Sequence, residues 1–281
     1  MWKRESGGRR LARFLPVVVV LMISIIIYSI YLVYNCFPLL QIEVPEEYRD
    51  DAARRRGFIH LLFSHLLASL MFWSLFKACV TGAGSVPDTT VWKSRPNTAE
   101  LVERKRDGTV RYCHKCAHYK PDRAHHSRHT GTCTLKLDHY CPWVANDIGY
   151  FNYKYFYLTL LYSTATLSFT SATMFPTVSA SSGKTSEGKC RGPNVTPVLP
   201  SIVGSFFIFH TYLLSINSST VEYCEKRRGG PGHDWDLGVW NNIKEVMVGL
   251  GSKVHQASAH ITSSVGGKPF SLACPRWRTL W

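Results

Sequence analysis

The sequence predicts an all-α integral membrane protein with four transmembrane helices and a small cysteine-rich domain between the second and third helices. Two observations support this fold class. Hydrophobic residues make up 45% of the 281 residues. They are concentrated in four uncharged blocks, each near or above the length that a bilayer-spanning helix needs. Cysteines and histidines gather in the polar segment between the second and third blocks.

Each expected element follows from these blocks in chain order. The first block is longer than the apolar region of a signal peptide, so we expect a retained anchor. The expected boundaries are 1–13 for a basic N-terminus, 14–34 for the first helix, 35–57 for a lumenal loop, 58–80 for the second helix, 81–154 for the cysteine-rich domain with its core at 111–156, 155–180 for the third helix, 181–196 for a second lumenal loop, 197–218 for the fourth helix and 219–281 for the C-terminal region.

The third block is the most polar of the four. Its hydroxyl residues are Ser163, Thr164, Thr166, Ser168, Thr170 and Ser171. Small hydroxyl residues occur in membrane helices where two helices pack closely or where a helix faces a cavity. Packing is the interpretation we favour, and cavity lining is the alternative. Similarly, we expect His60, His65 and His210 to be hydrogen-bonded inside the helix bundle.

Lysine and arginine near the block ends set the expected orientation. They are frequent in the N-terminus, in the large central segment and after the fourth block, so these parts are predicted to lie in the cytoplasm. Arg54, Arg55 and Arg56 argue the other way, but acidic residues share that short loop. The segment 181–196 would then face the lumen, where Asn194 begins a glycosylation acceptor pattern.

The net charge of +14 could indicate a nucleic-acid-binding protein. Here the basic residues cluster beside the expected spans, where anionic lipids attract each of them by about 1 kcal/mol. The lipid bilayer therefore explains the charge, and we expect no nucleic acid partner.

A metal site is predicted from four residues of the central segment: Cys113, Cys116, His126 and Cys133. Disulfides are disfavoured in the cytoplasm, and three thiolates with one imidazole suit a tetrahedral structural zinc. Zinc can contribute roughly 10 kcal/mol to the folding of a segment with so few apolar residues. The spacing leaves alternatives open: His125 or His129 could replace His126, and Cys141 could replace Cys133.

A possible catalytic group follows in the run Asp138-His139-Tyr140-Cys141. A cysteine reacts as the thiolate, so a nucleophilic Cys141 benefits from a base such as His139. Asp138 can orient that imidazole and stabilise the cation that it becomes. Neighbours in sequence need not meet in space, so spacing alone leaves this group a hypothesis.

This segment resembles the cysteine-rich domain of the DHHC family of protein S-acyltransferases, or palmitoyltransferases, with Tyr140 in place of the second histidine. The matching residues are the runs Tyr112–Cys116, Lys120–Arg123 and Leu135–Trp143, with His125, His126, Asn146, Gly149, Asn152 and Phe156. Further along the chain, Ser219–Glu222 resembles the family's Thr-Thr-x-Glu motif, and Asp236–Gly238 with Asn242 resembles its C-terminal motif.

The resemblance implies an acyltransferase. Cys141 would accept the acyl group of a fatty acyl-CoA such as palmitoyl-CoA and would then pass it to cysteines of membrane-associated protein substrates. In this scheme His139 is the general base, Asp138 is its orienting partner, and the enzyme itself carries palmitate as a lipoprotein. Lys120 and Arg123 are candidates to bind the CoA phosphates. The expected location is an endomembrane, Golgi or endoplasmic reticulum, or the plasma membrane, with several spans and both termini in the cytoplasm.

Departures from the family pattern predict one structural zinc ion instead of the two that members usually bind. The second ligand set maps onto Ser127, Thr130, Tyr140 and Asp147, which make a poor zinc site. Hydrogen bonds such as one from Tyr140 to Asp147 are expected to replace that metal. The alternative function is a catalytically impaired homologue that acts as a membrane-anchored zinc-binding recruitment module.

Overall fold

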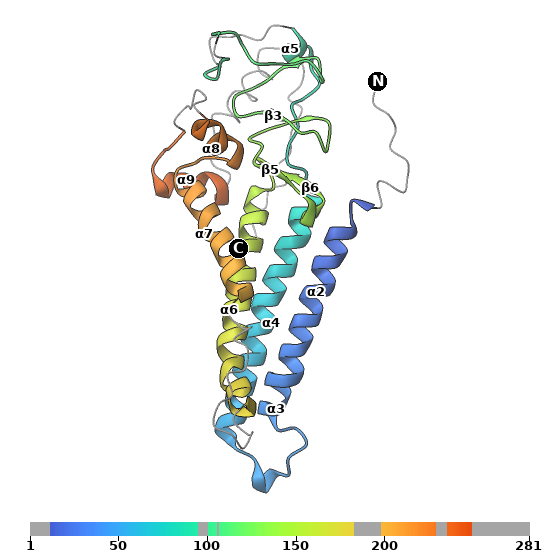
Figure 1. Ribbon diagram of the computed structural model, residues 1–281, viewed down its shortest axis with the longest axis vertical. Coiled ribbons are helices and arrows are strands. Elements are labelled where there is room, and N and C mark those ends of the chain that lie inside the picture. Colours follow the sequence, from blue (N-terminus) through green and yellow to red (C-terminus); the bar gives the residue numbers. More distant parts are fainter. Residues whose placement is uncertain (1–11, 95–100, 106, 183–197, 229–234, 249–281) are drawn as a thin grey trace.

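The computed structural model describes residues 12–94, 101–105, 107–182, 198–228 and 235–248. Its long helices lie along one axis, and the cysteine-rich segment lies at one end of them, with two short C-terminal helices beside it (Figure 1). The long helices are α2 (Leu15–Tyr31), α4 (Asp51–Val80), α6 (Tyr153–Ser182) and α7 (Val198–Ser215), and the short C-terminal ones are α8 (Thr220–Arg227) and α9 (Val239–Val248). Most of the predicted N-terminus, the loop with Asn194 and the residues after 248 lie outside the described part.

The first helix continues beyond its predicted end at residue 34. The π-helix η1 (Leu32–Cys36) and the helical turn α3 (Phe37–Leu40) follow α2 without a break. Asn35 is buried there, and its side-chain amide donates to His60 Nδ1 of α4 at 3.3 Å, so this polar residue stays inside the helical bundle. The helix ends where Gln41 adopts a left-handed conformation, with φ of 50°.

The second long helix begins seven residues before the predicted start at residue 58. Asp50 is its N-cap and accepts hydrogen bonds from the backbone N–H groups of Ala52 and Ala53 at 2.8 and 3.2 Å. Such a cap satisfies backbone donors that would otherwise lack partners, and so it extends the helix into charged sequence. The end of α4 at Val80 is the predicted one.

The hydroxyl groups of α6 bond within their own helix. Thr159, Thr164, Thr166, Thr170 and Thr173 each donate to the carbonyl oxygen four residues earlier, at 2.7–2.9 Å. This pattern is common for threonine inside helices, and it removes the need for an aqueous partner. The helix packs against α4 and α7, so the packing interpretation accounts for the hydroxyls that the sequence placed in this block.

Two stretches of helix are long and apolar enough to cross a membrane: Leu15–Leu40, with a mean hydropathy of 2.6, and Asp51–Val80, with 1.6. A third candidate is the pair Leu199–Ser215 and Thr220–Arg227, which bends by 80° at its break. Among the described residues, α6 is long enough but does not join these candidates. Its threonines and serines lower its hydropathy, as the sequence indicated.

The cysteine-rich segment consists of short antiparallel ladders joined by turns. Strand β1 (Tyr112–Cys113) pairs with β2 (His118–Tyr119), β3 (His125–His126) with β4 (Cys133–Thr134), and β5 (His139–Cys141) with β6 (Asn146–Ile148). The short helices η2 (Glu46–Tyr48), α5 (Thr90–Lys93) and η4 (Pro142–Val144) complete the described elements. A small core of apolar residues includes Val86, Trp92 and Leu135 and also takes in Cys113 and Cys133.

The β5–β6 hairpin is fixed to the end of α4 by two asparagines. The side-chain amide of Asn146 donates to the carbonyl oxygens of Ala78, Cys79 and Thr81 at 2.8–3.3 Å. Asn152 donates to Thr81 O at 3.1 Å and to Asp147 O at 2.7 Å, and it accepts from the N–H of Gly149. These bonds satisfy carbonyls at the helix C-terminus. They place the hairpin at the end of the helix bundle.

Glycines let the neighbouring backbones approach at this junction. Gly84 has φ of 95°, and a Cβ there would lie 2.7 Å from the ring of Phe151. A Cβ on Gly149 would lie 2.8 Å from the carbonyl oxygen of Leu135. Residues with larger side chains at either position would separate the hairpin from the segment that leaves α4.

Candidate active site and metal centre

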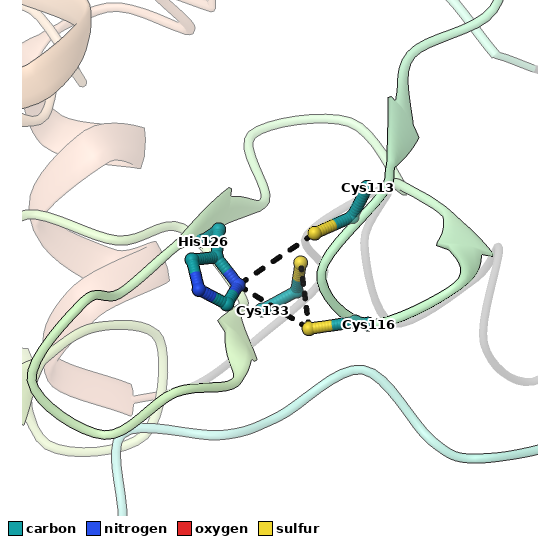
Figure 2. A group of neighbouring side chains, drawn as sticks. All are labelled: Cys113, Cys116, His126 and Cys133. Atoms are coloured by element: carbon teal, nitrogen blue, oxygen red, sulfur yellow. Dashed lines mark hydrogen bonds between the residues drawn. The ribbon is translucent and has the colours of Figure 1, made fainter. Parts of the chain in front are cut away.

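The four residues predicted as metal ligands meet at one point. Cys113 ends β1, Cys116 follows in the turn, and His126 and Cys133 are register partners in the β3–β4 ladder. Their ligand atoms all lie within 4.8 Å of one another (Figure 2). Two short ladders therefore bring together ligands that are up to 20 residues apart in the chain.

The spacing of these atoms fits a tetrahedral zinc ion. Bond lengths of about 2.3 Å for Zn–S and about 2.0 Å for Zn–N imply ligand separations of about 3.8 Å between sulfurs and about 3.5 Å between sulfur and nitrogen. Cys116 Sγ and Cys133 Sγ are 3.8 Å apart. His126 Nδ1 lies 3.2 Å from Cys116 Sγ and 3.6 Å from Cys113 Sγ. Nδ1 is thus the histidine atom that faces the site.

The protonation of these groups also fits a cation. Burial and the neighbouring Lys115 and Lys120 lower the pKa of His126, so its imidazole is neutral and can donate a lone pair. Burial and the adjacent thiols of Cys113 and Cys116 raise the pKa of Cys133. A divalent ion among the three sulfurs would offset the free energy needed to ionise these thiols and so favour the thiolates.

The alternative histidine ligands lie elsewhere. His125 Nδ1 faces the carboxylate of Glu225 on α8 at 3.7 Å. The ring of His129 stacks on Tyr140 with centroids 4.0 Å apart and planes within 8° of each other. Cys141 lies in a separate apolar cluster with Leu75 and Ala78 of α4, away from the core that holds Cys113 and Cys133.

Hydroxyl groups surround Asp147, at positions where the resemblance expects a second metal. Asp147 is buried and accepts hydrogen bonds from Ser127 Oγ at 2.7 Å, Thr130 Oγ1 at 2.6 Å and Thr134 Oγ1 at 3.1 Å. The hydroxyl donors give the carboxylate the partners that a buried charge requires. The ring of Tyr140, the donor that the sequence suggested, stacks on His129, and its bond to Asp147 stays a prediction. Thr134 was not expected in this group.

Asp138, His139 and Cys141 come together at strand β5. His139 Nδ1 donates to Asp138 Oδ2 at 2.6 Å. This bond places the proton of the neutral imidazole on Nδ1 and leaves Nε2 free to accept one. Cys141 is buried, and it lies near enough to His139 to raise the pKa of that histidine. His139 and Cys141 are two residues apart on the same strand, where they pair with Ile148 and Asn146. The side chains of His139 and Cys141 therefore lie on the same face of the hairpin.

Electrostatics stabilise the protonated form of His139. Burial by itself lowers the pKa of this histidine, but the hydrogen bond to Asp138 and the adjacent Cys141 outweigh it and raise the pKa to about 9. Burial opposes ionisation of Asp138, yet His139 and the backbone N–H of Thr220 lower the pKa of its carboxyl. A proton that passes from Cys141 to His139 is therefore held there, next to a stable carboxylate.

Helix α8 contributes a partner that sequence reasoning did not assign. Thr220 donates its backbone N–H to Asp138 Oδ1 at 2.7 Å and its hydroxyl to Asp138 Oδ2 at 2.9 Å. Ser219 caps the same helix, and Glu222 closes the capping box by accepting from the Ser219 N–H. The positive end of α8 thus faces the buried Asp138 carboxylate, which favours its ionised form. The sequence showed the Ser219–Glu222 motif but did not indicate that it bonds Asp138.

Arg123 is a buried anchor for α8, which contradicts the expectation that it binds CoA phosphates. It is 3% exposed, and its Nε and Nη2 bond both oxygens of Glu222 at 2.6 and 2.7 Å. Its other side-chain hydrogen bonds go to Asn217, and its guanidinium lies over the ring of Trp235. A buried guanidinium with this many partners has no pair of N–H donors left to bind a phosphate. The same role for Lys120 remains a prediction.

Lys136 extends this network to α9. Its ammonium donates to Asn217 Oδ1 at 2.8 Å and to Glu245 Oε1 at 3.1 Å. Burial and the nearby charge of Arg123 lower the pKa of Lys136 to about 8, although the carboxylate of Glu245 acts to raise it. Arg123, Lys136 and Asn217 all have positive φ, at 63°, 45° and 47°. Three uncommon backbone conformations therefore meet where the cysteine-rich segment contacts the α7–α8 turn.

Comparison with known proteins agrees with this geometry. The DHHC palmitoyltransferase family model matches residues 107–227, from the cysteine-rich segment to the end of α8. The chain is 32% identical to palmitoyltransferase ZDHHC15A of Danio rerio over 95% of its own length and 87% of the relative's. The chain belongs to the DHHC palmitoyltransferase family.

Other DHHC relatives come from distant organisms. Probable protein S-acyltransferase 13 of Arabidopsis thaliana is 36% identical over 59% of this chain and 61% of its own length. Palmitoyltransferase ZDHHC15 of Rattus norvegicus is 28% identical over 88% of this chain and 80% of its own length. Matches of this extent include the helices as well as the cysteine-rich segment. The chain is therefore a membrane protein of the DHHC family.

Proposed function

We propose that this protein is a membrane-embedded S-acyltransferase that carries a fatty acyl group on Cys141 and transfers it to cysteine thiols of other proteins. The carrying observation is the contact of Asp138, His139 and Cys141 at strand β5, with the His139–Asp138 bond at 2.6 Å. Family membership supports the reaction class. The residue roles are our assignment.

The first half-reaction forms a thioester on the enzyme. His139 takes the proton of Cys141 on Nε2, and the thiolate attacks the carbonyl carbon of a fatty acyl-CoA such as palmitoyl-CoA. The carbon–sulfur bond to CoA breaks, and the CoA thiolate takes the proton from His139 and leaves as a thiol. Asp138 holds the imidazole in one tautomer and stabilises the imidazolium. Thr220 fixes Asp138 with two hydrogen bonds.

The second half-reaction passes the acyl group to a substrate. A protein thiol loses its proton to His139 and attacks the Cys141 thioester, so that Cys141 leaves as the thiolate and is reprotonated. Thioesters are exchanged for thioesters, so neither step forms a bond much stronger than the one it breaks. We expect membrane-associated proteins with accessible cysteines as substrates, because Cys141 lies at the end of the helix bundle.

One structural zinc ion is part of the proposal. Cys113, Cys116, His126 and Cys133 would hold it, and it would supply folding free energy and no reactive group. The site lies in the core that also contains Leu135 and Val86, next to the loop that leads to Asp138. Asp147 and its hydroxyl partners would fix the β5–β6 hairpin without a second metal.

The proposed topology has four transmembrane helices: Leu15–Leu40, α4, α6 and α7. The hydropathy of two of them supports it, and the internal hydroxyl bonds of α6 let that helix lie in lipid as well. The acyl chain would lie among these helices. We further propose that both termini and the cysteine-rich domain lie in the cytoplasm, in an endomembrane such as the Golgi or endoplasmic reticulum or in the plasma membrane.

Labelling with an acyl-CoA analogue tests the proposal. The purified protein in detergent should acquire a hydroxylamine-sensitive label, and Cys141→Ala should lose it while keeping its zinc. Cys79→Ala is a matched control, because Cys79 packs against the same apolar cluster. If Cys141→Ala keeps the label, the nucleophile is wrong. If it loses zinc, Cys141 is a metal ligand. A wild-type chain that binds zinc but never labels would support the recruitment module.

A further inference from the structure

A buried histidine of the membrane domain lies beside the catalytic residues. His210 of α7 is 1% exposed, in a helix that the topology places in the bilayer. Its Nδ1 lies 3.3 Å from the hydroxyl of Tyr153, at the start of α6. Polar side chains inside membranes are costly unless they have partners, and they often serve a function. The two-step reaction as written above assigns no role to this pair.

The ring of His210 is part of an aromatic cluster that contacts His139. Phe156 contacts both histidines, with ring centroids 5.1 Å from His139 and 4.9 Å from His210, both edge to face. The two imidazole centroids are 6.0 Å apart. Phe206 packs edge to face against both His210, at 4.7 Å, and Phe156, at 6.2 Å. The rings of α6 and α7 thus form one side of the space that His139 occupies.

These contacts complement the hydrogen bond to Asp138. That bond fixes the Nδ1 atom of His139 but allows the ring to rotate about it. Contact with Phe156 and His210 restricts the plane of the ring, and therefore the direction in which Nε2 points. Edge-to-face pairs have a preferred geometry, so displacing one ring displaces the next. The Tyr153–His210 hydrogen bond joins α6 to α7 and restricts the imidazole ring of His210.

We propose that His210, held by Tyr153, is a positioning residue that keeps the imidazole of His139 aligned with Cys141 from the membrane side. The inference rests on the proposed function of Cys141. It assigns the transmembrane helices a part in the chemistry beyond holding lipid. His210 acts through His139 and takes no proton from the substrate.

A second tyrosine–histidine pair provides the control. Tyr28 of α2 and His65 of α4 make the same contact, hydroxyl to Nδ1, at 2.8 Å, on the exposed side of the bundle. Tyr28→Phe and Tyr153→Phe each remove one oxygen atom from equivalent pairs in the membrane domain. The Tyr28 hydroxyl also contacts Ser64 Oγ at 3.3 Å, so Tyr28→Phe removes at least as many contacts as Tyr153→Phe. Of the two pairs, the Tyr153 pair is the one that adjoins the rings that contact His139.

The test measures the rate of Cys141 acylation against the concentration of palmitoyl-CoA in purified protein. Tyr153→Phe should lower the maximal rate about fivefold, the effect of one ordinary hydrogen bond, with an unchanged half-saturating concentration. His210→Phe should lower it at least as much. His210→Asn, whose side-chain oxygen can accept from Tyr153 near the position of Nδ1, should recover part of the loss. Tyr28→Phe should stay within about twofold of wild type.

Other results would overturn the inference. Equal maximal rates for Tyr153→Phe and Tyr28→Phe would do so, as would a change confined to the half-saturating concentration, because that would place His210 in substrate binding. If His210→Phe is misfolded, Tyr153→Phe decides the question. Cys141→Ala is assayed in parallel. If this variant keeps its label, the proposed function fails. If it loses the label but Tyr153→Phe is acylated at the wild-type rate, only this inference fails.

Discussion

Replacing Asp138 by asparagine removes one negative charge from the site and almost no volume. The carboxylate accepts three hydrogen bonds, from His139 Nδ1 at 2.6 Å and from the N–H and hydroxyl of Thr220 at 2.7 and 2.9 Å. An asparagine has one acceptor oxygen and two donors of its own. In Asp138→Asn, its amide group must therefore face either the Thr220 N–H or the Nδ1 of His139. Either orientation breaks a bond or selects the wrong tautomer.

The magnitude follows from the pKa of His139. Asp138 and Cys141 together raise this pKa from 6.5 to about 9 against the effect of burial. At about 1.4 kcal/mol per pKa unit, the imidazolium is stabilised by a net of about 3 kcal/mol. Without the carboxylate, burial should return the pKa to 6.5 or below. Losing both the charge and the tautomer should slow acyl transfer by about 10²- to 10⁴-fold.

Two measurements check this prediction. The first is the maximal rate of Cys141 acylation, with Asp122→Asn as the control. Asp122 lies in the same segment and accepts hydrogen bonds from the N–H groups of Val102 and Glu103, but it is not part of the His139 site. A rate for Asp138→Asn within about threefold of the control would refute the assigned role.

The second measurement is thermal unfolding against pH. Because the pKa of folded His139 is raised, its contribution to stability is fully present below pH 6.5 and is lost as the pH rises through about 9. The wild-type midpoint should fall across this window, and the midpoint of Asp138→Asn should fall less. Parallel curves would show that Asp138 does not set the pKa of His139.

Three further predictions concern the metal, the Asp147 cluster and the anchor of α8. Cys116→Ser should reduce zinc from about one ion per chain to none by elemental analysis; full zinc content would exclude Cys116 as a ligand. Asp147→Asn should lower the free energy of unfolding by about 1–3 kcal/mol in denaturant titrations without loss of zinc, whereas loss of zinc would make Asp147 a ligand. Arg123→Lys should cost a similar 1–3 kcal/mol, because lysine cannot bond both Glu222 oxygens in parallel, and the exposed Arg128→Lys should cost almost nothing. Equal stability of the two lysine variants would contradict the anchoring role.

The helices could be predicted from sequence because a bilayer requires long uncharged runs. Their ends were less accessible, since local bonds decide them. Asp50 starts α4 within charged sequence, and the buried Asn35 with His60 continues the first helix beyond the apolar block. Aspartate and asparagine are also common in loops, so the sequence alone does not show that Asp50 and Asn35 extend these helices. His60 and His210 are hydrogen-bonded inside the bundle, as expected, whereas His65 bonds Tyr28 on the exposed side of the bundle.

The site could be predicted where its residues are close in sequence. Cys113 and Cys116 share a turn, and Asp138 and His139 are neighbours, so spacing carries the information. Partners that come from distant segments were missed: Thr220 lies 82 residues from Asp138, and Asn217 lies 94 residues from Arg123. The error at Arg123 has the same origin. An arginine in sequence shows its charge but not the Glu222 that neutralises it.

The attachment of Asp138 to Thr220 also determines when the enzyme becomes competent during its synthesis. The ribosome completes Cys141 and the four zinc ligands well before it reaches α7 and α8. At about 5–20 residues per second, roughly 80 further residues take several seconds, and in the proposed topology α7 must then enter the bilayer. Only then does Thr220 reach the carboxylate. With the roles proposed above, a nascent chain carries Cys141 without the complete set of groups that orients His139, so premature acylation of a half-inserted protein is expected to be slow.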